Sequence, residues 1–328
     1  MTPLLAPMLA PFELLYASLV RARNARFDRI PAQRLAWPVI SVGNLSVGGA
    51  GKTPLVICLA RLLAGAGLHP DVLSRGYGRS SQQVERVDSA GSAVRFGDEP
   101  LLIARTAGVP VYVAARRYEA GQLAERESPV PGIHLLDDGF QHRQLARNLD
   151  IVVMHPSDLK QRLLPAGRLR EPLASLRRAD VLVLRHEDAE LESLLRAYVR
   201  RECSVWRVRR TLALSSPVER AIAFCAIARP GEFFRDLGAA GAGVAERVPF
   251  RDHHCYTEAD INRLAELGRR TRCDAFVTTA KDEVKLDRAL RLRLNQVAPL
   301  TTAALTVELE DPQGALDLMR KSLIVTAR

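Results

Sequence analysis

A glycine-rich segment, residues 41–54, has the sequence of a phosphate-binding loop. It reads Ser-Val-Gly-Asn-Leu-Ser-Val-Gly-Gly-Ala-Gly-Lys-Thr-Pro, follows an apolar strand-like run and precedes a helical pattern of leucines. In a P-loop, glycines let backbone N–H groups crowd around phosphate oxygens, and the helix N-terminus adds partial positive charge. Lys52 would then reach the β- and γ-phosphates, while the Thr53 hydroxyl would ligate Mg²⁺. The residues expected to bind the nucleotide are Asn44, Ser46, Val47, Gly48, Gly49, Ala50, Gly51, Lys52 and Thr53.

One position departs from the usual P-loop pattern. Ser46 stands where the first glycine of G-x-x-x-x-G-K-T is expected, so an ordinary glycine-rich turn before a helix is the alternative interpretation. The lysine argues against that alternative, because the chain has only five lysines among its 47 basic residues. A chain that otherwise uses arginine has a lysine at the position where a P-loop requires one. The segment therefore predicts a nucleoside triphosphate site.

Two pairs of acidic residues lie where elements of the expected fold meet. Asp137 and Asp138 end an apolar run, and ligands bind beyond the carboxyl ends of strands in open α/β sheets. We expect this pair to orient Mg²⁺ or its waters, with a simple Asx turn as the alternative. Asp98 and Glu99 open a probable helix, where acids are also favoured as caps. Asp98 is nevertheless a candidate for the base that takes the proton of an acceptor hydroxyl.

Basic residues and histidines supply further candidates. Arg75-Gly-Tyr-Gly78 directly follows a strand, and residues 159–178 hold six basic residues and one acid. Arginines there suit phosphate or anionic lipid, whereas a solvated helix face is the alternative. In the segment 250–256, Asp252 precedes two adjacent histidines, a poor geometry for zinc. A histidine tuned by a carboxylate for proton transfer is the better interpretation. Residues 278–286 hold two of the five lysines, in either a structural or an anion-binding role.

Composition limits the class of protein. The 328 residues are 47% hydrophobic and carry a net charge of +10, which favours an acidic partner such as nucleic acid, anionic lipid or a phosphorylated substrate. Aromatic residues make up only 5%, so a base-stacking surface is poorly supplied and no nucleic-acid partner is expected. Five scattered cysteines without a C-x-x-C pair argue against disulfides and structural zinc and favour a reducing cytoplasm.

The first 27 residues predict a helix that associates with a membrane surface. Residues 2–20 are mostly apolar and are followed by Arg21, Arg23 and Arg26, which is the reverse of the order in a signal peptide. An amphipathic helix with arginines at the level of lipid phosphates explains this order. Docking of the same helix on the core of the protein is the alternative, and the two do not exclude each other.

The remaining pattern predicts an α/β fold with a mostly parallel sheet flanked by helices, as in P-loop NTPases. We expect a P-loop core over 28–207 and a smaller α/β lobe over 208–328, with the last helix free to pack back on the core. Expected strands are 37–42, 70–74, 110–114, 132–137, 150–154, 180–184, 220–227, 245–249, 274–278 and 301–308. Expected helices are 53–66, 98–107, 117–125, 188–201, 230–239, 257–270 and 311–323.

Taken together, these motifs resemble the tetraacyldisaccharide 4′-kinase family of the lipid A pathway in Gram-negative bacteria. Members of this family carry Ser or Thr at the position of Ser46. One local departure is Ala228-Arg-Pro-Gly-Glu-Phe-Phe234, where the family commonly has Gly-Asn-Pro before the two phenylalanines. The resemblance covers nearly the whole chain and rests on 43–54, 74–78, 97–100, 136–142, 163–172, 252–253 and 281–282.

The resemblance implies transfer of the ATP γ-phosphoryl group to the 4′-hydroxyl of a tetraacylated glucosamine disaccharide 1-phosphate, giving lipid IVA. It also implies Mg²⁺ and peripheral attachment to the cytoplasmic face of the inner membrane. By position, Asp98 would be the base with His253 as its partner, and His254 is the fallback. Glu99, Asp137 and Asp138 would complete the metal shell with Thr53. Candidates for substrate or phosphate contacts are Arg75, Tyr77, Arg117, Arg168 and Arg170.

Two other functions remain open on the sequence. A regulatory P-loop ATPase or GTPase would use hydrolysis as a protein-binding switch and would need no lipid acceptor. A soluble kinase of small metabolites would leave the apolar N-terminus without a use. No protein partner is predicted, and the anionic membrane surface and the acylated disaccharide are the expected partners.

Overall fold

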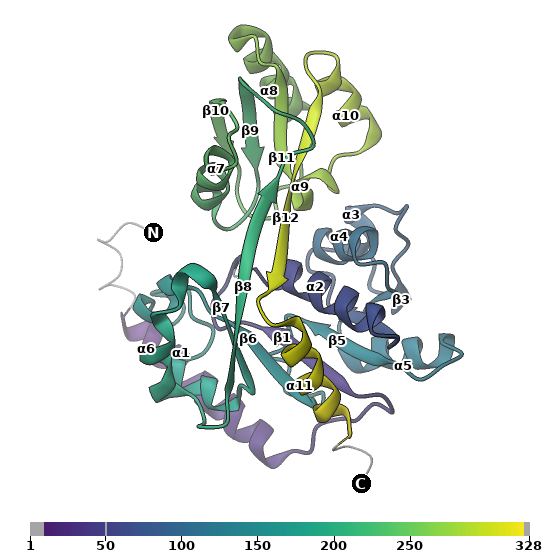
Figure 1. Cartoon of the computed structure of the whole chain (residues 1–328), viewed down its shortest axis with the longest axis vertical. Coiled ribbons are helices and arrows are strands. Elements are labelled where there is room, and N and C mark those ends of the chain that lie inside the picture. Colours follow the sequence, from purple (N-terminus) through teal and green to yellow (C-terminus); the bar gives the residue numbers. More distant parts are fainter. Residues whose placement is uncertain (1–9, 50, 325–328) are drawn as a thin grey trace.

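One twelve-stranded sheet runs through residues 10–49 and 51–324, which are the residues that the computed structural model describes (Figure 1). Its strand order is β10-β9-β11-β12-β8-β7-β6-β1-β5-β2-β4-β3. The strands are β1 (Val39–Gly43), β2 (Pro70–Ser74), β3 (Glu85–Arg86), β4 (Val111–Val113), β5 (Ile133–Asp137), β6 (Leu149–Val153), β7 (Val181–Arg185), β8 (Ser204–Ala213), β9 (Ala221–Cys225), β10 (Val244–Pro249), β11 (Ala275–Thr279) and β12 (Leu300–Leu309).

Most neighbouring strands are parallel, as the sequence predicts. The antiparallel pairs are β8 with β12 and β3 with β4. Strands β8 and β12 are the longest, and Figure 1 shows them running together from the lower part of the molecule, which contains β1, to the upper part, which contains β9 to β11. The predicted domain boundary at 207/208 lies within β8, and the division into units stays a prediction.

Helices flank the sheet at the expected places, with one exception. The predicted helix 188–201 is wrong, because only Leu191 and Leu195 of this segment are buried and the chain forms short turns around a five-residue helix. The helix α10 was not expected. The α-helices are α1 (Ala10–Arg29), α2 (Lys52–Gly65), α3 (Ala93–Phe96), α4 (Asp98–Thr106), α5 (Arg117–Glu127), α6 (Leu191–Leu195), α7 (Pro230–Ala239), α8 (Glu258–Thr271), α9 (Ala280–Glu283), α10 (Arg288–Asn295) and α11 (Pro312–Ile324).

Side chains of the central strands alternate between two layers of core, as strand geometry requires. Ile40 and Val42 of β1 pack on the face that α2 covers, whereas Val39 packs on the face that α5 covers. The last helix, α11, returns to the first of these faces, and its buried Met319 belongs to the same apolar cluster as Leu59 of α2. Parallel strands buried on both faces hold the carboxyl ends of β1, β2 and β5 in fixed positions at one edge.

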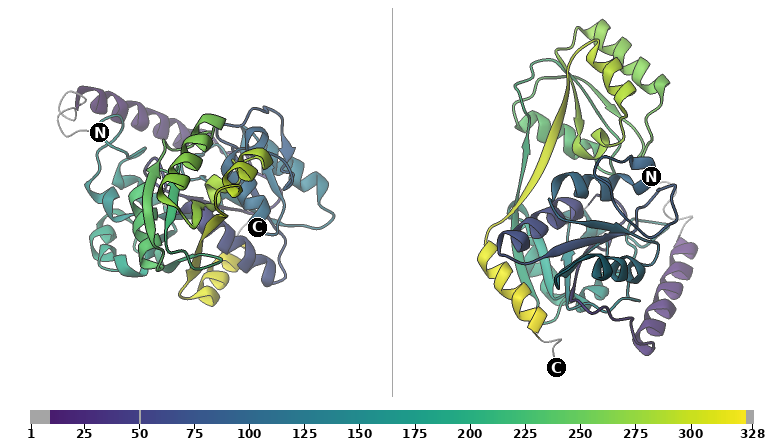
Figure 2. Two further views of the ribbon diagram at one scale, coloured as in Figure 1. Left: turned by 90° about the horizontal axis from the view of Figure 1, so that it is seen from above. Right: turned by 90° about the vertical axis from the view of Figure 1, so that its right-hand side faces the viewer.

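Helix α1 lies along the outside of the lower part, as the right-hand view in Figure 2 shows. The predicted N-terminal segment 1–27 is therefore helical from residue 10, and residues 1–9 lie outside the described residues. One side of α1 contacts the body of the protein, and Val20 on this side is buried. The opposite side exposes apolar side chains. Both of the uses that the sequence left open for this helix are therefore compatible with its position.

A buried ionic cluster lies at the amino-terminal ends of the strands, whereas the P-loop lies at their carboxyl ends. His134 at the start of β5 is fully buried, with its Nδ1 2.8 Å from Asp71 Oδ1 and its Nε2 3.4 Å from Glu125 Oε1. Burial opposes the charged imidazolium, but the hydrogen bonds to Asp71 and Glu125 prevail and raise the pKa of His134 to about 9. The Trp37 ring stacks on this imidazole at 5.2 Å. The cluster therefore stabilises the folded state in the protonated form.

Stability should fall as pH rises above neutrality because of His134. A folded-state pKa above the unfolded value contributes stability that is complete below pH 6.5 and is lost as pH passes about 9. The free energy of unfolding in urea should drop by about 2 kcal/mol between about pH 6.5 and about pH 10. His134→Gln should remove most of this dependence, while the exposed control His69→Gln should keep it. An equal pH dependence in both variants would contradict this role of His134.

Candidate functional site

The segment between β1 and α2 has the geometry of a phosphate-binding loop. It leaves the sheet at Gly43, and α2 begins at Lys52. Gly48 and Gly51 have φ values of 94° and 87°, a region that a side chain disfavours, so glycine is required at both turns. Ala50 lies outside the described residues. The strand, glycine-rich turn and helix that the sequence predicts are all present.

Lys52 points back over the loop. Its Nζ donates to Asn44 Oδ1 at 2.9 Å and lies 3.4 Å from Asp138 Oδ1. Asn44 is itself buried, and its Nδ2 donates to the Ser46 carbonyl oxygen at 2.8 Å and to Ser46 Oγ at 3.2 Å. Ser46 thus does what a glycine could not do, because its hydroxyl accepts a bond that fixes the asparagine holding the lysine. This is a physical reason for the departure from the usual pattern.

The two aspartates at the end of β5 have contrasting surroundings. Asp137 is buried, accepts a hydrogen bond from Ser74 Oγ at 3.2 Å, and has an Oδ1 that makes no hydrogen bond within the described part of the chain. Burial and the charges of Glu99 and Asp138 raise the pKa of Asp137 to about 7. Burial also disfavours ionised Asp138, but Lys52 and Arg170 prevail and lower its pKa. One aspartate is thus neutralised by cations, while the other has an unpaired oxygen.

This acidic cluster fits a divalent cation that takes most of its coordinating oxygens from a bound phosphate and from water. Asp137 Oδ1 is buried without a hydrogen-bond partner in the described part of the chain, and Asp138 and Glu99 add negative charge nearby. A bound cation would neutralise this charge. Among residues 10–49 and 51–324, no three His, Cys, Asp or Glu side chains form a complete metal-binding group. Mg²⁺ is commonly held by one or two carboxylates together with water and phosphate oxygens. Thr53 in the first turn of α2, Asp137 and Asp138 are the side chains that would hold such a cation.

Asp98 meets a histidine from the upper part of the molecule. It is the first residue of α4, is 6% exposed, and its Oδ2 lies 2.9 Å from His253 Nδ1. His254 instead places its Nε2 2.9 Å from Asp260 Oδ2, so His253 is the histidine that contacts Asp98. His253 has a φ of 59°, which turns its side chain toward α4. The Tyr77 ring lies 5.2 Å from this imidazole.

A lysine completes the same cluster. Lys281 Nζ lies 2.9 Å from Glu99 Oε1 and 3.8 Å from Asp98 Oδ2. Burial acts to raise the pKa of Asp98, but the hydrogen bond from His253 and the charge of Lys281 lower it below its ordinary range. The hydrogen bond to Asp98 raises the pKa of His253 in turn. Asp98 is therefore ionised at neutral pH, which a group that accepts a proton requires.

The other predicted arginines are divided between the site and its margin. Arg117, the first residue of α5, is buried close to Asp138 and Asp137, and burial lowers its pKa to about 10. Arg75 follows β2 and is exposed, and its positive charge also lowers the pKa of Arg117. Tyr77 is 64% exposed beside His253. The loop after β2 thus borders the open side of the site.

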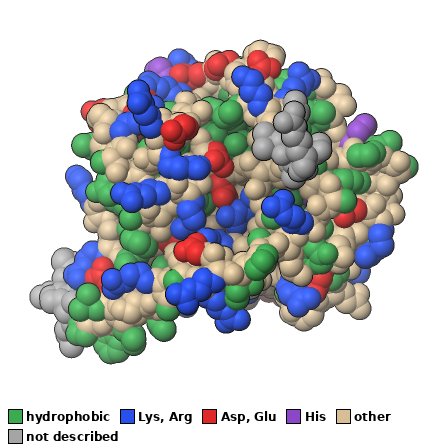
Figure 3. All heavy atoms as spheres, turned by 90° about the horizontal axis from the view of Figure 1, so that it is seen from below, with side chains coloured by type: hydrophobic (Ala, Val, Ile, Leu, Met, Phe, Trp, Pro, Cys, Tyr) green, Lys and Arg blue, Asp and Glu red, His purple; other side chains and the backbone are tan. Residues whose placement is uncertain are grey.

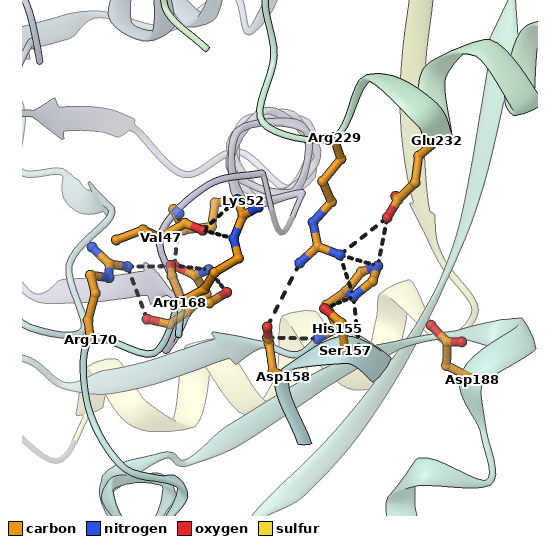
Figure 4. Close-up of polar contacts among 12 residues, drawn as sticks. Val47, Lys52, His155, Ser157, Asp158, Arg168, Arg170, Asp188, Arg229 and Glu232 are labelled. Atoms are coloured by element: carbon orange, nitrogen blue, oxygen red, sulfur yellow. Dashed lines mark hydrogen bonds and ion pairs between the residues drawn. The ribbon is translucent and has the colours of Figure 1, made fainter. Parts of the chain in front are cut away.

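Arg168 and Arg170 lie directly on the phosphate-binding loop (Figure 4). Arg170 donates to both carboxylate oxygens of Asp138 at 2.8 Å, and its Nη2 also donates to Asn44 Oδ1 at 2.5 Å. Arg168 donates through Nε and Nη2 to the Val47 carbonyl oxygen at 3.2 and 3.0 Å. These guanidinium groups add positive charge where a triphosphate would lie. Of the two, Arg170 also pairs with the charge of Asp138.

Comparisons with known proteins agree with this geometry. The family model described as tetraacyldisaccharide-1-P 4′-kinase (LpxK) matches residues 5–323. The chain belongs to this family. A tetraacyldisaccharide 4′-kinase of Koribacter versatilis is 46% identical over 319 residues, covering 94% of this chain and 96% of that protein. One of Aeromonas salmonicida is 40% identical over 290 residues, covering 85% and 83%.

A solved structure of the LpxK family has the same fold. The crystal structure of LpxK from Aquifex aeolicus in complex with ATP matches with a TM-score of 0.77 at 33% identity, over 97% of this chain and 99% of that one. The prediction of the family and of the P-loop type of α/β fold is thereby confirmed. The switch-protein alternative is not favoured, because the named relatives are kinases.

Two features of this LpxK-family site were not predicted. The contact of Lys281 with Asp98 and Glu99 links segments 182 residues apart, and its signal in the sequence was the rarity of lysine. A second cluster joins the end of β6 to α7, with His155 Nε2 2.9 Å from Glu232 Oε1 and Arg229 3.2 Å from the same oxygen (Figure 4). Nothing in the sequence spacing brings these residues together.

Proposed function

We propose that this protein is an ATP-dependent kinase that phosphorylates the 4′-hydroxyl of a tetraacyldisaccharide 1-phosphate. Membership of the LpxK family supports the reaction, and the observation that carries it is the pairing of Asp98 with His253 beside the phosphate-binding loop. ATP is the phosphoryl donor, in line with the ATP complex of the Aquifex aeolicus protein. The product is lipid IVA.

The phosphate-binding loop and its cations orient the triphosphate. Backbone N–H groups of residues 48, 49 and 51–53 would bind the phosphate oxygens, and Lys52 and Arg170 would supply positive charge to the β- and γ-phosphates. Mg²⁺, held by Thr53, Asp137 and Asp138, would supply charge neutralisation on those phosphates, with Glu99 acting through water. Because the groups are fixed before the reaction, positioning and electrostatic stabilisation account for most of the rate.

Asp98 takes the proton of the sugar hydroxyl as that oxygen attacks the γ-phosphorus. His253 holds the carboxylate in place through its Nδ1, and Lys281 keeps it ionised. Arg75, Tyr77 and Arg117 border the open side of the site, where the anionic disaccharide 1-phosphate would enter. The exposed tyrosine ring beside His253 suits a sugar face, and the arginines suit its phosphate.

A membrane surface supplies the lipid acceptor. Within residues 10–49 and 51–324, none of the helices has the length and apolar character needed to cross a bilayer. Helix α1 instead exposes Phe12, Leu14, Leu15 and Leu19, each more than half exposed. Figure 3 views the molecule from below and shows hydrophobic side chains gathered at one corner, beside basic side chains. This combination supports peripheral attachment to an anionic membrane, and we assign it to the cytoplasmic face of the inner membrane.

Polar substitution of the exposed side of α1 should weaken membrane binding. Leu15→Ser combined with Leu19→Ser removes apolar surface that would enter the headgroup region, so association with anionic vesicles should fall about tenfold or more. Sedimentation with phosphatidylglycerol-containing vesicles measures this. The matched control is Leu194→Ser with Leu292→Ser, two leucines of similar exposure far from α1. Equal binding of both double variants would contradict the assignment of α1.

Mass spectrometry of the lipid product tests the reaction itself. The purified full-length protein is incubated with ATP, Mg²⁺ and detergent-dispersed tetraacyldisaccharide 1-phosphate. We expect one added phosphate, located on the distal sugar at its 4′ position. Hydrolysis of ATP without a phosphorylated lipid would instead support the regulatory ATPase alternative.

A further inference from the structure

The side of α1 that faces the protein contacts one segment in particular. Residues 161–172, here called the arginine strap, make five polar contacts with this side of the helix, three of them through Glu13 and Tyr16. Glu13 Oε1 accepts from the Leu163 amide at 3.0 Å, and Glu13 Oε2 lies 2.5 Å from Arg162 Nη2. Tyr16 Oη donates to the Arg170 carbonyl oxygen at 3.1 Å. Among the exposed leucines, Leu14 and Leu15 point away from this side of α1.

Main-chain hydrogen bonds join the strap to the phosphate-binding loop. The Val47 amide donates to the Arg168 carbonyl oxygen at 2.8 Å, and the Arg170 amide donates to the Leu45 carbonyl oxygen at 2.7 Å. The strap turns tightly at Gly167, where an added Cβ would lie 2.2 Å from the Arg162 carbonyl oxygen. Glycine is therefore needed there, and the turn brings both arginines to the loop. A displacement of the strap would therefore move Arg168 and Arg170 relative to the loop.

Glu171 joins the strap to α1 through hydrogen bonds of its buried carboxylate. Its side chain is 0% exposed, and its carboxylate accepts from Arg23 at 3.1 Å, Asn24 at 3.1 Å and Arg178 at 2.9 Å. A buried carboxylate is tolerated only when it is paired and hydrogen-bonded, so these three donors hold the strap at this point. Two of the three donors belong to α1. The preceding residue in the chain, Arg170, donates hydrogen bonds to Asp138 and Asn44.

We propose that Tyr16 and Glu171 are positioning residues that hold Arg170 over the phosphate-binding loop, so that the docking of α1 sets the turnover of the kinase. This inference rests on the proposed function. It gives α1 a second role, because one side of the helix meets the lipid surface while the other supports the strap. The chain of contacts runs from α1 through Glu171 and Arg170 to Asp138 and Lys52.

Steady-state kinetics of Tyr16→Phe and Glu171→Gln separate this role from simple attachment. The full-length protein is assayed with ATP, Mg²⁺ and detergent-dispersed acceptor, and vesicle binding is measured alongside. We expect kcat to fall about tenfold in Glu171→Gln and severalfold in Tyr16→Phe, because small misplacements of a catalytic cation are costly. KM for ATP should change much less, and vesicle binding should stay as in the wild type.

The matched control is Asp28→Asn. It removes an ion pair of α1 with Arg143, at 2.5 Å, that does not touch the strap, and kcat should stay within about twofold of the wild type. If both Tyr16→Phe and Glu171→Gln keep wild-type kcat, the inference is wrong while the proposed function stands. If the wild type itself transfers no phosphate, the proposed function falls first. Should Glu171→Gln unfold, Tyr16→Phe decides alone, since it removes one hydroxyl group.

Discussion

Replacing Asp98 with asparagine should lower kcat by about a thousandfold while the protein still binds an ATP analogue. The carboxylate is the proton acceptor of the reaction, and an amide of the same shape cannot take the proton. Because Asp98 touches His253 and Lys281 rather than the loop itself, nucleotide affinity should be nearly unchanged. Phosphate transfer to the dispersed acceptor and calorimetric titration with the analogue measure the two effects separately.

The neighbouring acid–histidine pair offers a matched control for Asp98. Asp260 lies 2.9 Å from His254, the same distance as in the catalytic pair, but its other hydrogen bonds are with Thr257 at the start of α8. Asp260→Asn should keep kcat within about twofold of the wild type, at a cost of about 1 kcal/mol of stability or less from the weakened capping box that Asp260 forms with Thr257. Equal activity losses in the two variants would show that Asp98 acts only through stability. Loss of nucleotide binding in Asp98→Asn would move Asp98 from the acceptor to the nucleotide.

Substitution of Lys52 with methionine should reduce kcat by roughly two to three orders of magnitude. The ammonium group neutralises charge on the transferring phosphoryl group, and methionine keeps the length of the side chain without the charge. The lysine also contacts Asn44 and Asp138, so the change leaves Arg170 as the cation that remains paired with Asp138. Initial rates of phosphate transfer at saturating ATP provide the measurement.

Lys160→Met is the control for this charge removal. Lys160 is another of the five lysines and is exposed at the end of a short turn after β6. Its loss should leave kcat within about twofold of the wild type, because an exposed charge away from the site is screened by solvent. If Lys52→Met transferred phosphate at the rate of Lys160→Met, the loop would not be the triphosphate site.

Local sequence signals were sufficient for much of this fold. The P-loop was predictable because its glycines, Lys52 and Thr53 are adjacent in the chain and lie between a strand and a helix pattern. Asp137 and Asp138 were predictable in position for the same reason, since they end an apolar run. The helix predicted at 188–201 failed because its apolar stripe covers one turn only, which is too short to specify a long helix against tertiary packing.

The spacing of residues along the sequence could not predict contacts between distant segments of the chain. Spacing could not decide between His253 and His254, and only the left-handed backbone at His253 directs that ring to Asp98. The same holds for Lys281 and for the hydrogen bonds of Glu171 with α1, because each joins segments more than 140 residues apart. The resemblance to the family supplied roles for Asp98 and His253 that no local signal carries.

A structure of the protein with Mg²⁺, a non-hydrolysable ATP analogue and the disaccharide acceptor tests the central claim most directly. We expect the γ-phosphate beside Lys52 and the acceptor hydroxyl within hydrogen-bond distance, about 3 Å, of Asp98. A triphosphate bound away from the glycine-rich loop, or an acceptor hydroxyl facing a group other than Asp98, would contradict it.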